Sequence, residues 1–98
     1  MRNYKLERLQ NGETFETKEF GNSMYPKIKS GQPHIVQPAK WESVNVDDIV
    51  YCKVNGRFFT HLVKAKDMQK GVLIGNNKGG INGWTKQVFG KVIEVLDY

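Results

Sequence analysis

The stretch VDDIVYCKVNGRFFTHLVK, residues 46–64, decides the fold because it holds two apolar runs joined by a tight-turn dipeptide. Asn55-Gly56 is typical of a two-residue hairpin, since both residues tolerate a positive φ. The flanking runs are rich in the β-branched and aromatic residues that favour strands. We therefore expect one strand over residues 46–54 and a returning strand over residues 57–64.

The segment before this hairpin predicts more β structure. Asn11-Gly12 lies between two short apolar runs, so the pattern predicts an N-terminal hairpin over about residues 4–19. A serine-bearing segment of about residues 20–31 follows. Residues 33–38 then read as a strand with a proline at each end, which favours a short strand or an edge position.

The segment after the hairpin repeats the strand pattern. Strands are expected over residues 71–75 and 88–95, separated by a loop of asparagines and glycines over residues 76–83. No helical periodicity is evident in any part of the chain. The core strands, about 33–95, and the segments before them therefore predict a single all-β domain over residues 1–98, with a compact coiled-sheet or barrel-like fold.

Composition narrows the class of protein. The chain has 98 residues and a single cysteine, Cys52, which excludes an internal disulfide framework and a zinc site built from several cysteines. We expect no metal and no cofactor. No apolar run reaches the roughly 18 residues that a membrane span requires, and no signal peptide is evident. These features predict a cytoplasmic protein without a membrane segment.

The segment GNSMYP, residues 21–26, holds the strongest candidate for chemistry. Gly21 allows a tight backbone and Pro26 fixes its own φ, so the turn between them can present Ser23 rigidly beside free backbone N–H groups. A serine hydroxyl is a weak nucleophile and needs an adjacent base. The candidate bases for Ser23 are therefore the histidine and lysine side chains.

His61 is the favoured base, although a histidine in mid-strand is ordinarily a packed core residue. It shares one face of its expected strand with Phe59, while Lys64 points to the other face. An imidazole can accept a proton near neutral pH. His34 is the rival base, since it lies closer to Ser23 in the sequence.

Five motifs together resemble the superfamily of LexA-type repressor-cleavage proteins and signal peptidases, which are serine peptidases. They are the serine box at 21–26, VDDIV at 46–50, THLV at 60–63, IGNN at 74–77 and FGKV at 89–92. The resemblance extends over about residues 20–95, in the family's order. It departs from the family at Asp47, where glycine is usual.

The resemblance implies a stand-alone serine peptidase with a Ser/His dyad. Ser23 matches the nucleophile, and His61 matches the general base that archaeal and endoplasmic-reticulum signal peptidases use in place of lysine. The backbone N–H groups of Ser23 and Met24 match the oxyanion hole. A protein or peptide substrate would lie as an extended strand in a groove. The candidate groove residues are Gly21, Asn22, Tyr25 and Pro26.

The histidine branch of the family also carries an acid after the asparagine loop. Residues 78–81 contain no carboxylate here, which leaves Asp48, Asp67 or Asn77 as candidates for the group that orients the histidine. The chain contains neither Ala-Gly nor Cys-Gly, the dipeptides at which LexA-type proteins cut themselves. We therefore expect the substrate to be another protein.

Two other functions fit the same sequence. The first is a catalytically inactive module of this fold that binds a host or partner protein, as a phage-encoded protein would. By analogy with LexA-type domains, two copies could also pair through the C-terminal strand. The second is nucleic-acid binding, since the net charge is +5. Its candidate stacking residues are Trp41, Trp84, Tyr25 and Tyr51. The basic residues are dispersed along the chain, so nucleic acid is not the favoured partner.

Overall fold

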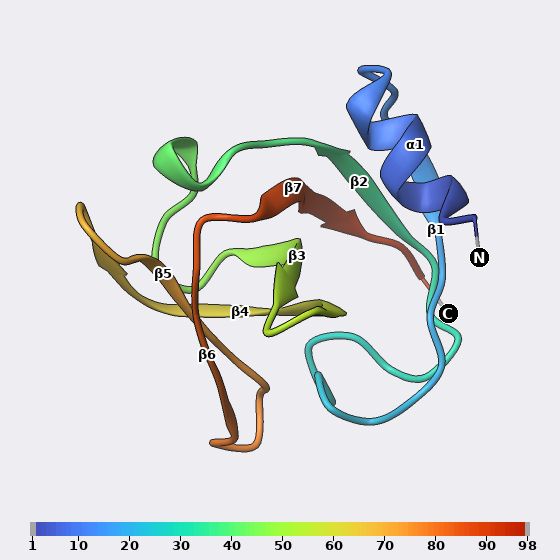
Figure 1. Ribbon diagram of the computed structural model, residues 1–98. Coiled ribbons are helices and arrows are strands. Elements are labelled where there is room, and N and C mark those ends of the chain that lie inside the picture. The colour runs from blue at the N-terminus through green and yellow to red at the C-terminus, as the bar shows by residue number, and fades with distance from the viewer. Residues whose placement is uncertain (1, 98) are drawn as a thin grey trace.

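The computed structural model describes residues 2–97, which form one seven-stranded antiparallel sheet with a short N-terminal helix (Figure 1). The strands are β1 (Phe15–Thr17), β2 (His34–Pro38), β3 (Ile49–Val54), β4 (Arg57–Asp67), β5 (Gly71–Gly75), β6 (Ile81–Thr85) and β7 (Val88–Val95). The helices are α1 (Tyr4–Gln10) and a single 3-10 turn, η1 (Trp41–Ser43). The strand order is β1-β2-β7-β3-β4-β5-β6. The predicted all-β class is confirmed.

The central hairpin forms where its turn dipeptide predicts. Asn55 and Gly56 have φ values of 50° and 81°, which is the backbone of a type I′ turn. β3 begins at Ile49 rather than residue 46, because Asp47 takes a φ of 77° and bends the chain before the strand. That left-handed conformation is one that glycine adopts more easily than aspartate.

The predicted N-terminal hairpin is wrong, because residues 4–10 form α1. The side chain of Asn3 accepts a hydrogen bond from Leu6 N–H and so caps the helix at its start. Asn11-Gly12 ends the helix instead of turning a hairpin: Asn11 keeps a negative φ, and only Gly12 is left-handed, at 84°. Leu9 is the buried residue of α1.

β2 is short, as its flanking prolines predict, but it is not an edge strand. It pairs with β1 on one side and with β7 on the other. Pro33 precedes the strand and Pro38 is its last residue, so neither removes a hydrogen bond from the middle of the ladder.

The sheet curls strongly, and this curvature brings β6 back toward β3 (Figure 1). Register shifts interrupt four of the strand pairs, and such bulges bend strands. Gly83 of β6 lies against Val54 of β3, although β4 and β5 stand between them in the sheet. A valine-rich cluster fills the concave interior, with Val44, Val50, Val54, Val63, Val72 and Ile74 at its centre.

β6 differs from the sequence prediction, because its first three residues, 81–83, fall within the loop expected over residues 76–83. The loop is shorter and ends at Gly80, whose carbonyl accepts a hydrogen bond from Asn76 N–H. The two remaining predicted strands, 71–75 and 88–95, match β5 and β7. No helix among residues 2–97 is long and apolar enough to cross a membrane.

Candidate active site

The serine-bearing loop, residues 19–31, is closed at its base and anchored on the sheet. Gly31 N–H donates to the Glu19 carbonyl at 2.7 Å, and Gly21 N–H donates to Ser30 Oγ at 3.0 Å. Met24 and Ile28 are buried and form a small apolar cluster with Leu62 of β4. Ser23 therefore lies exposed beside a buried anchor, with little freedom to move away from the sheet.

Asn77 holds the turn on both sides of Met24. Its backbone N–H donates to the Ser23 carbonyl at 2.9 Å, and its side-chain amide donates to the Tyr25 carbonyl at 3.0 Å. The loop after β5 thus fixes the backbone that carries the serine. Asn77 is one of the three candidate partners of the histidine in the sequence, but it contacts the serine turn instead.

His61 lies within hydrogen-bond distance of Ser23. Its Nε2 is 3.1 Å from Ser23 Oγ, although 38 residues separate the two in the sequence. The ring is buried and stacks on Phe59, with 4.9 Å between ring centroids. The structure therefore brings together the two residues that the sequence predicts as nucleophile and base.

Asn82 of β6 completes a three-residue chain. His61 Nδ1 is 2.7 Å from Asn82 Oδ1. An amide oxygen only accepts, so Nδ1 carries the proton and Nε2 presents its lone pair to the serine hydroxyl. This is the arrangement in which an imidazole can remove the hydroxyl proton.

Asn82 is not among the residues that the sequence predicts for this role; those candidates make other contacts. Asp48 accepts from Asn45 N–H and pairs with Lys91, and Asp67 accepts from two backbone N–H groups in the turn after β4. Asn82 was assigned to a loop. The signal that could have found it is the alternation of Ile81-Asn82-Gly83-Trp84-Thr85, which is consistent with a short strand.

The two predicted oxyanion-hole groups make no hydrogen bond with the described residues, 2–97. Among residues 2–97, neither Ser23 N–H nor Met24 N–H donates to another protein group, whereas Tyr25 N–H donates to the Asn22 carbonyl. Free N–H groups next to a nucleophilic hydroxyl are the donors that an oxyanion requires.

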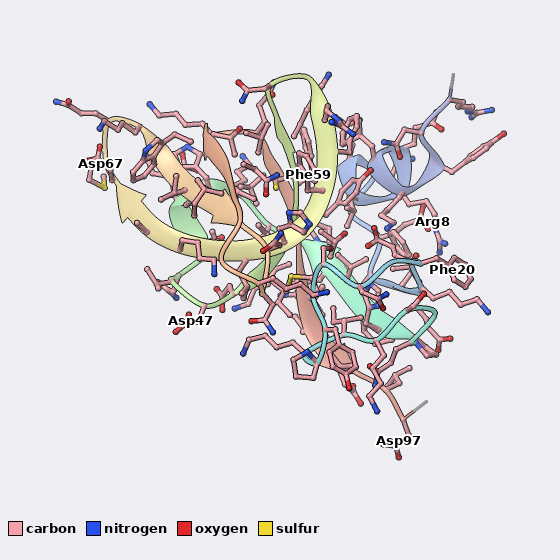
Figure 2. The ribbon with its side chains drawn as sticks, turned by 90° about the horizontal axis from the view of Figure 1, so that it is seen from below. Arg8, Phe20, Asp47, Phe59, Asp67 and Asp97 are labelled. Atoms are coloured by element: carbon pink, nitrogen blue, oxygen red, sulfur yellow. The ribbon has the colours of Figure 1, made fainter. Side chains whose placement is uncertain are left out.

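A cavity of about 140 Å³ opens beside Ser23 and His61. Phe20 of the serine-bearing loop and Phe59 of β4, both labelled in Figure 2, contribute to its walls. Of the four predicted groove residues, Gly21 lines this cavity, whereas Asn22, Tyr25 and Pro26 do not. The Tyr25–Pro26 peptide bond is cis.

The rival bases contact other groups. His34 is buried, and its Nε2 lies 3.7 Å from Glu19 Oε2, while Lys64 lies over Gly75. Burial raises the pKa of the Glu19 carboxyl, but His34, Lys5 and Thr60 outweigh that effect and lower it to about 2. Glu19 is therefore ionised at neutral pH.

Cys52 offers no alternative nucleophile. The thiol is fully buried in β3, and burial raises its pKa to about 12, so it is not a thiolate at neutral pH. Among residues 2–97, no group of three histidine, cysteine or acidic side chains could hold a metal ion.

Comparison with known proteins adds no relative. No model of a known protein family matches the sequence, and a search of curated proteins finds no match either.

Proposed function

We propose that the protein is a serine peptidase of the LexA and signal-peptidase type, in which Ser23 attacks a peptide bond of another protein. The observation that carries this proposal is the 3.1 Å approach of His61 Nε2 to Ser23 Oγ, with Asn82 bound to the opposite ring nitrogen. A base within hydrogen-bond distance of the nucleophile, itself oriented by a third group, is the signature of nucleophilic catalysis.

In the first step, Ser23 Oγ attacks the carbonyl carbon of the scissile bond while its proton moves to His61 Nε2. The carbonyl oxygen becomes an oxyanion, which the N–H groups of Ser23 and Met24 can stabilise. The C–N bond then breaks, and His61 returns the proton to the departing amine. The products of this step are a free amine and an ester of Ser23.

In the second step, water attacks the ester carbonyl and gives a proton to His61. Collapse of the intermediate breaks the bond to Ser23 Oγ, which takes the proton back, and releases the new carboxyl terminus. Asn82 holds the ring in the same tautomer through both steps. Unlike a carboxylate, it adds no negative charge to stabilise the imidazolium that forms in between.

The test combines labelling and cleavage. A fluorophosphonate reacts with an activated serine, so we expect it to label the wild-type protein at Ser23, with the adduct located by mass spectrometry. A randomised peptide library should be cut by the wild type. Ser23→Ala and His61→Ala should each lower cleavage by about 10⁴-fold or more, with circular dichroism unchanged.

Ser43→Ala is the matched control, because Ser43 is an exposed serine whose hydroxyl donates to the Lys40 carbonyl, away from His61. It should leave labelling and cleavage as they are. Absence of labelling and of cleavage in the folded wild type would contradict the proposal. That result would favour the second candidate function, a module that holds an extended segment of a partner protein without cutting it. The observation behind this candidate is Asn82, whose neutral amide stands where a triad would have a carboxylate.

A further inference from the structure

The mouth of the cavity beside Ser23 is formed in part by aromatic side chains that are open to solvent. Phe20 is 80% exposed and Phe58 is 36% exposed, and both line the cavity. Phe59, another lining residue, is half-buried. A ligand that entered the cavity would cover these rings, and the removal of apolar area from water would favour its binding.

Three basic side chains stand around these aromatic walls. Lys29 is itself a lining residue of the cavity. Lys53 Nζ lies 5.2 Å from the centre of the Phe58 ring, and Arg57 Cζ lies 5.9 Å from the centre of the Phe59 ring. The three cations come from the serine-bearing loop, β3 and β4, so the fold alone gathers them.

These cations have no carboxylate partner among residues 2–97, where every ion pair involves other basic side chains. Of the lining residues in this range, Glu19 alone is acidic. Its charge is already offset within the protein, because Lys5 Nζ lies 3.1 Å from its Oε2. The mouth of the cavity therefore carries positive charge that the described chain does not neutralise.

This combination of charge and apolar surface fits an acidic protein segment. Unpaired cations at the edge of a cavity attract carboxylates, and the low-dielectric walls concentrate their field. The cavity between them has a volume of about 140 Å³, and its walls include the buried side chains of Met24 and Ile28. Such a cavity suits an apolar side chain of the same segment.

A nucleic acid is also negatively charged, but its bases would need free ring faces on which to stack. Phe58 already stacks on Tyr51, with 5.6 Å between ring centroids, and Phe59 stacks on His61. Each of the two phenylalanine rings also has a cation over it. These contacts favour a protein segment over a nucleic acid.

We infer that the protein recognises an acidic segment of its substrate. Carboxylates of the segment bind Lys29, Lys53 and Arg57, and an apolar side chain between them enters the cavity. The inference rests on the proposed function for the cleavage of that segment. Recognition rests only on the charges and walls of the cavity, so binding and cleavage can be tested apart.

The first experiment measures binding without turnover. Ser23→Ala is titrated with three acetylated heptapeptide amides that share a central leucine: an acidic peptide (GEDLDEG), its amide analogue (GQNLNQG) and a basic peptide (GKKLKKG). At low ionic strength we expect the acidic peptide to bind about tenfold more tightly than the amide analogue, as a few exposed charge pairs would give. The basic peptide should bind most weakly. The preference should fade in about 1 M salt, where the Debye length is about 3 Å.

Substitution of the cations tests where the peptide binds. Lys53→Gln and Arg57→Gln should each lower the preference for the acidic peptide by about two- to fivefold. The double variant Lys53→Glu, Arg57→Glu should prefer the basic peptide, a reversal that loss of structure could not produce. Lys70→Gln is the matched control, because Lys70 Nζ lies 5.4 Å from the centre of the Trp84 ring but does not line the cavity. It should leave the preference unchanged.

Two results of these titrations would overturn the inference directly. One is equal affinity of the acidic peptide and its amide analogue at low ionic strength, and the other is an effect of Lys70→Gln as large as that of Lys53→Gln. A ten-nucleotide oligothymidylate that displaced the acidic peptide at equal concentration would also overturn it, in favour of a nucleic-acid partner.

The second experiment reads the peptides cut from the randomised library by the wild type. We expect aspartate and glutamate to be enriched close to the cleavage site. Cleavage without that enrichment overturns the inference and leaves the peptidase proposal intact. Tight binding of the acidic peptide by Ser23→Ala, with no labelling of Ser23 in the wild type, supports the recognition of an acidic segment and contradicts the peptidase.

Discussion

Asn82 presents a neutral amide to His61 at a position where serine peptidases often have a carboxylate. Its Oδ1 accepts the Nδ1 proton at 2.7 Å, so it fixes the tautomer as a carboxylate would. Amide partners in this position are compatible with catalysis, as in cysteine proteases with a Cys-His-Asn arrangement. The orientation of the ring, rather than added charge, is what Asn82 contributes.

Removing that orientation should slow the chemical step. We expect Asn82→Ala to lower kcat for peptide cleavage by about 10²- to 10⁴-fold with KM little changed, because the ring can then adopt the wrong tautomer. Asn82→Asp should retain most of the activity, since its carboxylate accepts from the same N–H. Equal losses in both variants would show that Asn82 acts through packing alone.

Glu19 should make the free energy of unfolding depend on pH in the acidic range. The folded chain lowers the pKa of this carboxyl from 4.5 to about 2, so folding is favoured by its ionised form. That contribution is complete above pH 4.5 and disappears as pH falls toward 2. Because the side chain is 37% exposed, solvent screens part of the effect.

Urea unfolding as a function of pH tests this assignment. Glu19→Gln should be less stable than the wild type at pH 7, and the difference should vanish near pH 2. Glu13→Gln is the control, since Glu13 forms an exposed pair with Arg8. A Glu19→Gln deficit that stayed constant over this pH range would contradict the role of the ionised carboxylate.

The strand pair β5–β6 determines whether Asn82 reaches His61. Gly71 begins β5 with a φ of 93°, and a Cβ there would collide with the carbonyl of Thr85, the last residue of β6. Gly79 has a similar φ of 88°, but open space surrounds it. Substitution of Gly79 therefore tests backbone strain alone, whereas substitution of Gly71 tests backbone strain together with a steric clash.

Alanine at each position should give different losses of stability. Gly79→Ala should cost about 1 kcal/mol, the strain of a left-handed residue with a side chain. Gly71→Ala should cost about 1–3 kcal/mol more, because β6 must move away. Thermal and urea unfolding measure both. Equal losses of stability in the two variants would mean that β6 can move away from residue 71 with no change in the free energy of unfolding.

Prediction from the sequence succeeded where local chemistry was decisive. The Asn55-Gly56 turn fixes a hairpin because both its residues adopt positive φ, so β3 and β4 were predictable. The hairpin predicted at Asn11-Gly12 is wrong because the same dipeptide also ends helices. Leu6 and Leu9 alone form too short an apolar pattern to indicate α1. Local pattern cannot distinguish a hairpin turn from a helix end.

The candidate site was predictable in part, for a different reason. Ser23 and His61 were predicted together because a serine turn and a mid-strand histidine resemble a known arrangement, and the structure places them 3.1 Å apart. Asn82 was not, because its approach to His61 depends on the curvature of the sheet and on the pairing of β6 with β5. Those are properties of long-range packing, which no short segment of sequence encodes.

The helix and the sheet share one apolar cluster, formed by Leu9, Phe15, Val36 and Tyr51. Leu9 is 3% exposed and reaches the backbone of β7 at Gly90, where a Cβ would touch it. Asn3 also donates to the Tyr51 hydroxyl at 2.8 Å. The stability of the protein therefore depends on α1, although Ser23, His61 and Asn82 all lie outside the helix.

Leu9→Ala should accordingly lower the free energy of unfolding by about 2–5 kcal/mol, since it leaves a cavity between α1 and the sheet. Met68→Ala is the control, because Met68 is exposed in the turn after β4, and it should stay within about 0.5 kcal/mol. At temperatures where the Leu9→Ala variant remains folded, labelling of Ser23 should be unchanged. Loss of labelling in that folded variant would contradict the separation of helix and site.

The three groups of the site are scattered along the chain, with 38 residues between Ser23 and His61 and 21 between His61 and Asn82. During synthesis, Ser23 therefore leaves the ribosome before His61, and His61 leaves before Asn82. Until β6 has emerged and joined the sheet, the growing polypeptide carries an unactivated serine. On the proposed function, the capacity to cut a peptide would therefore appear only after most of the chain has been synthesised.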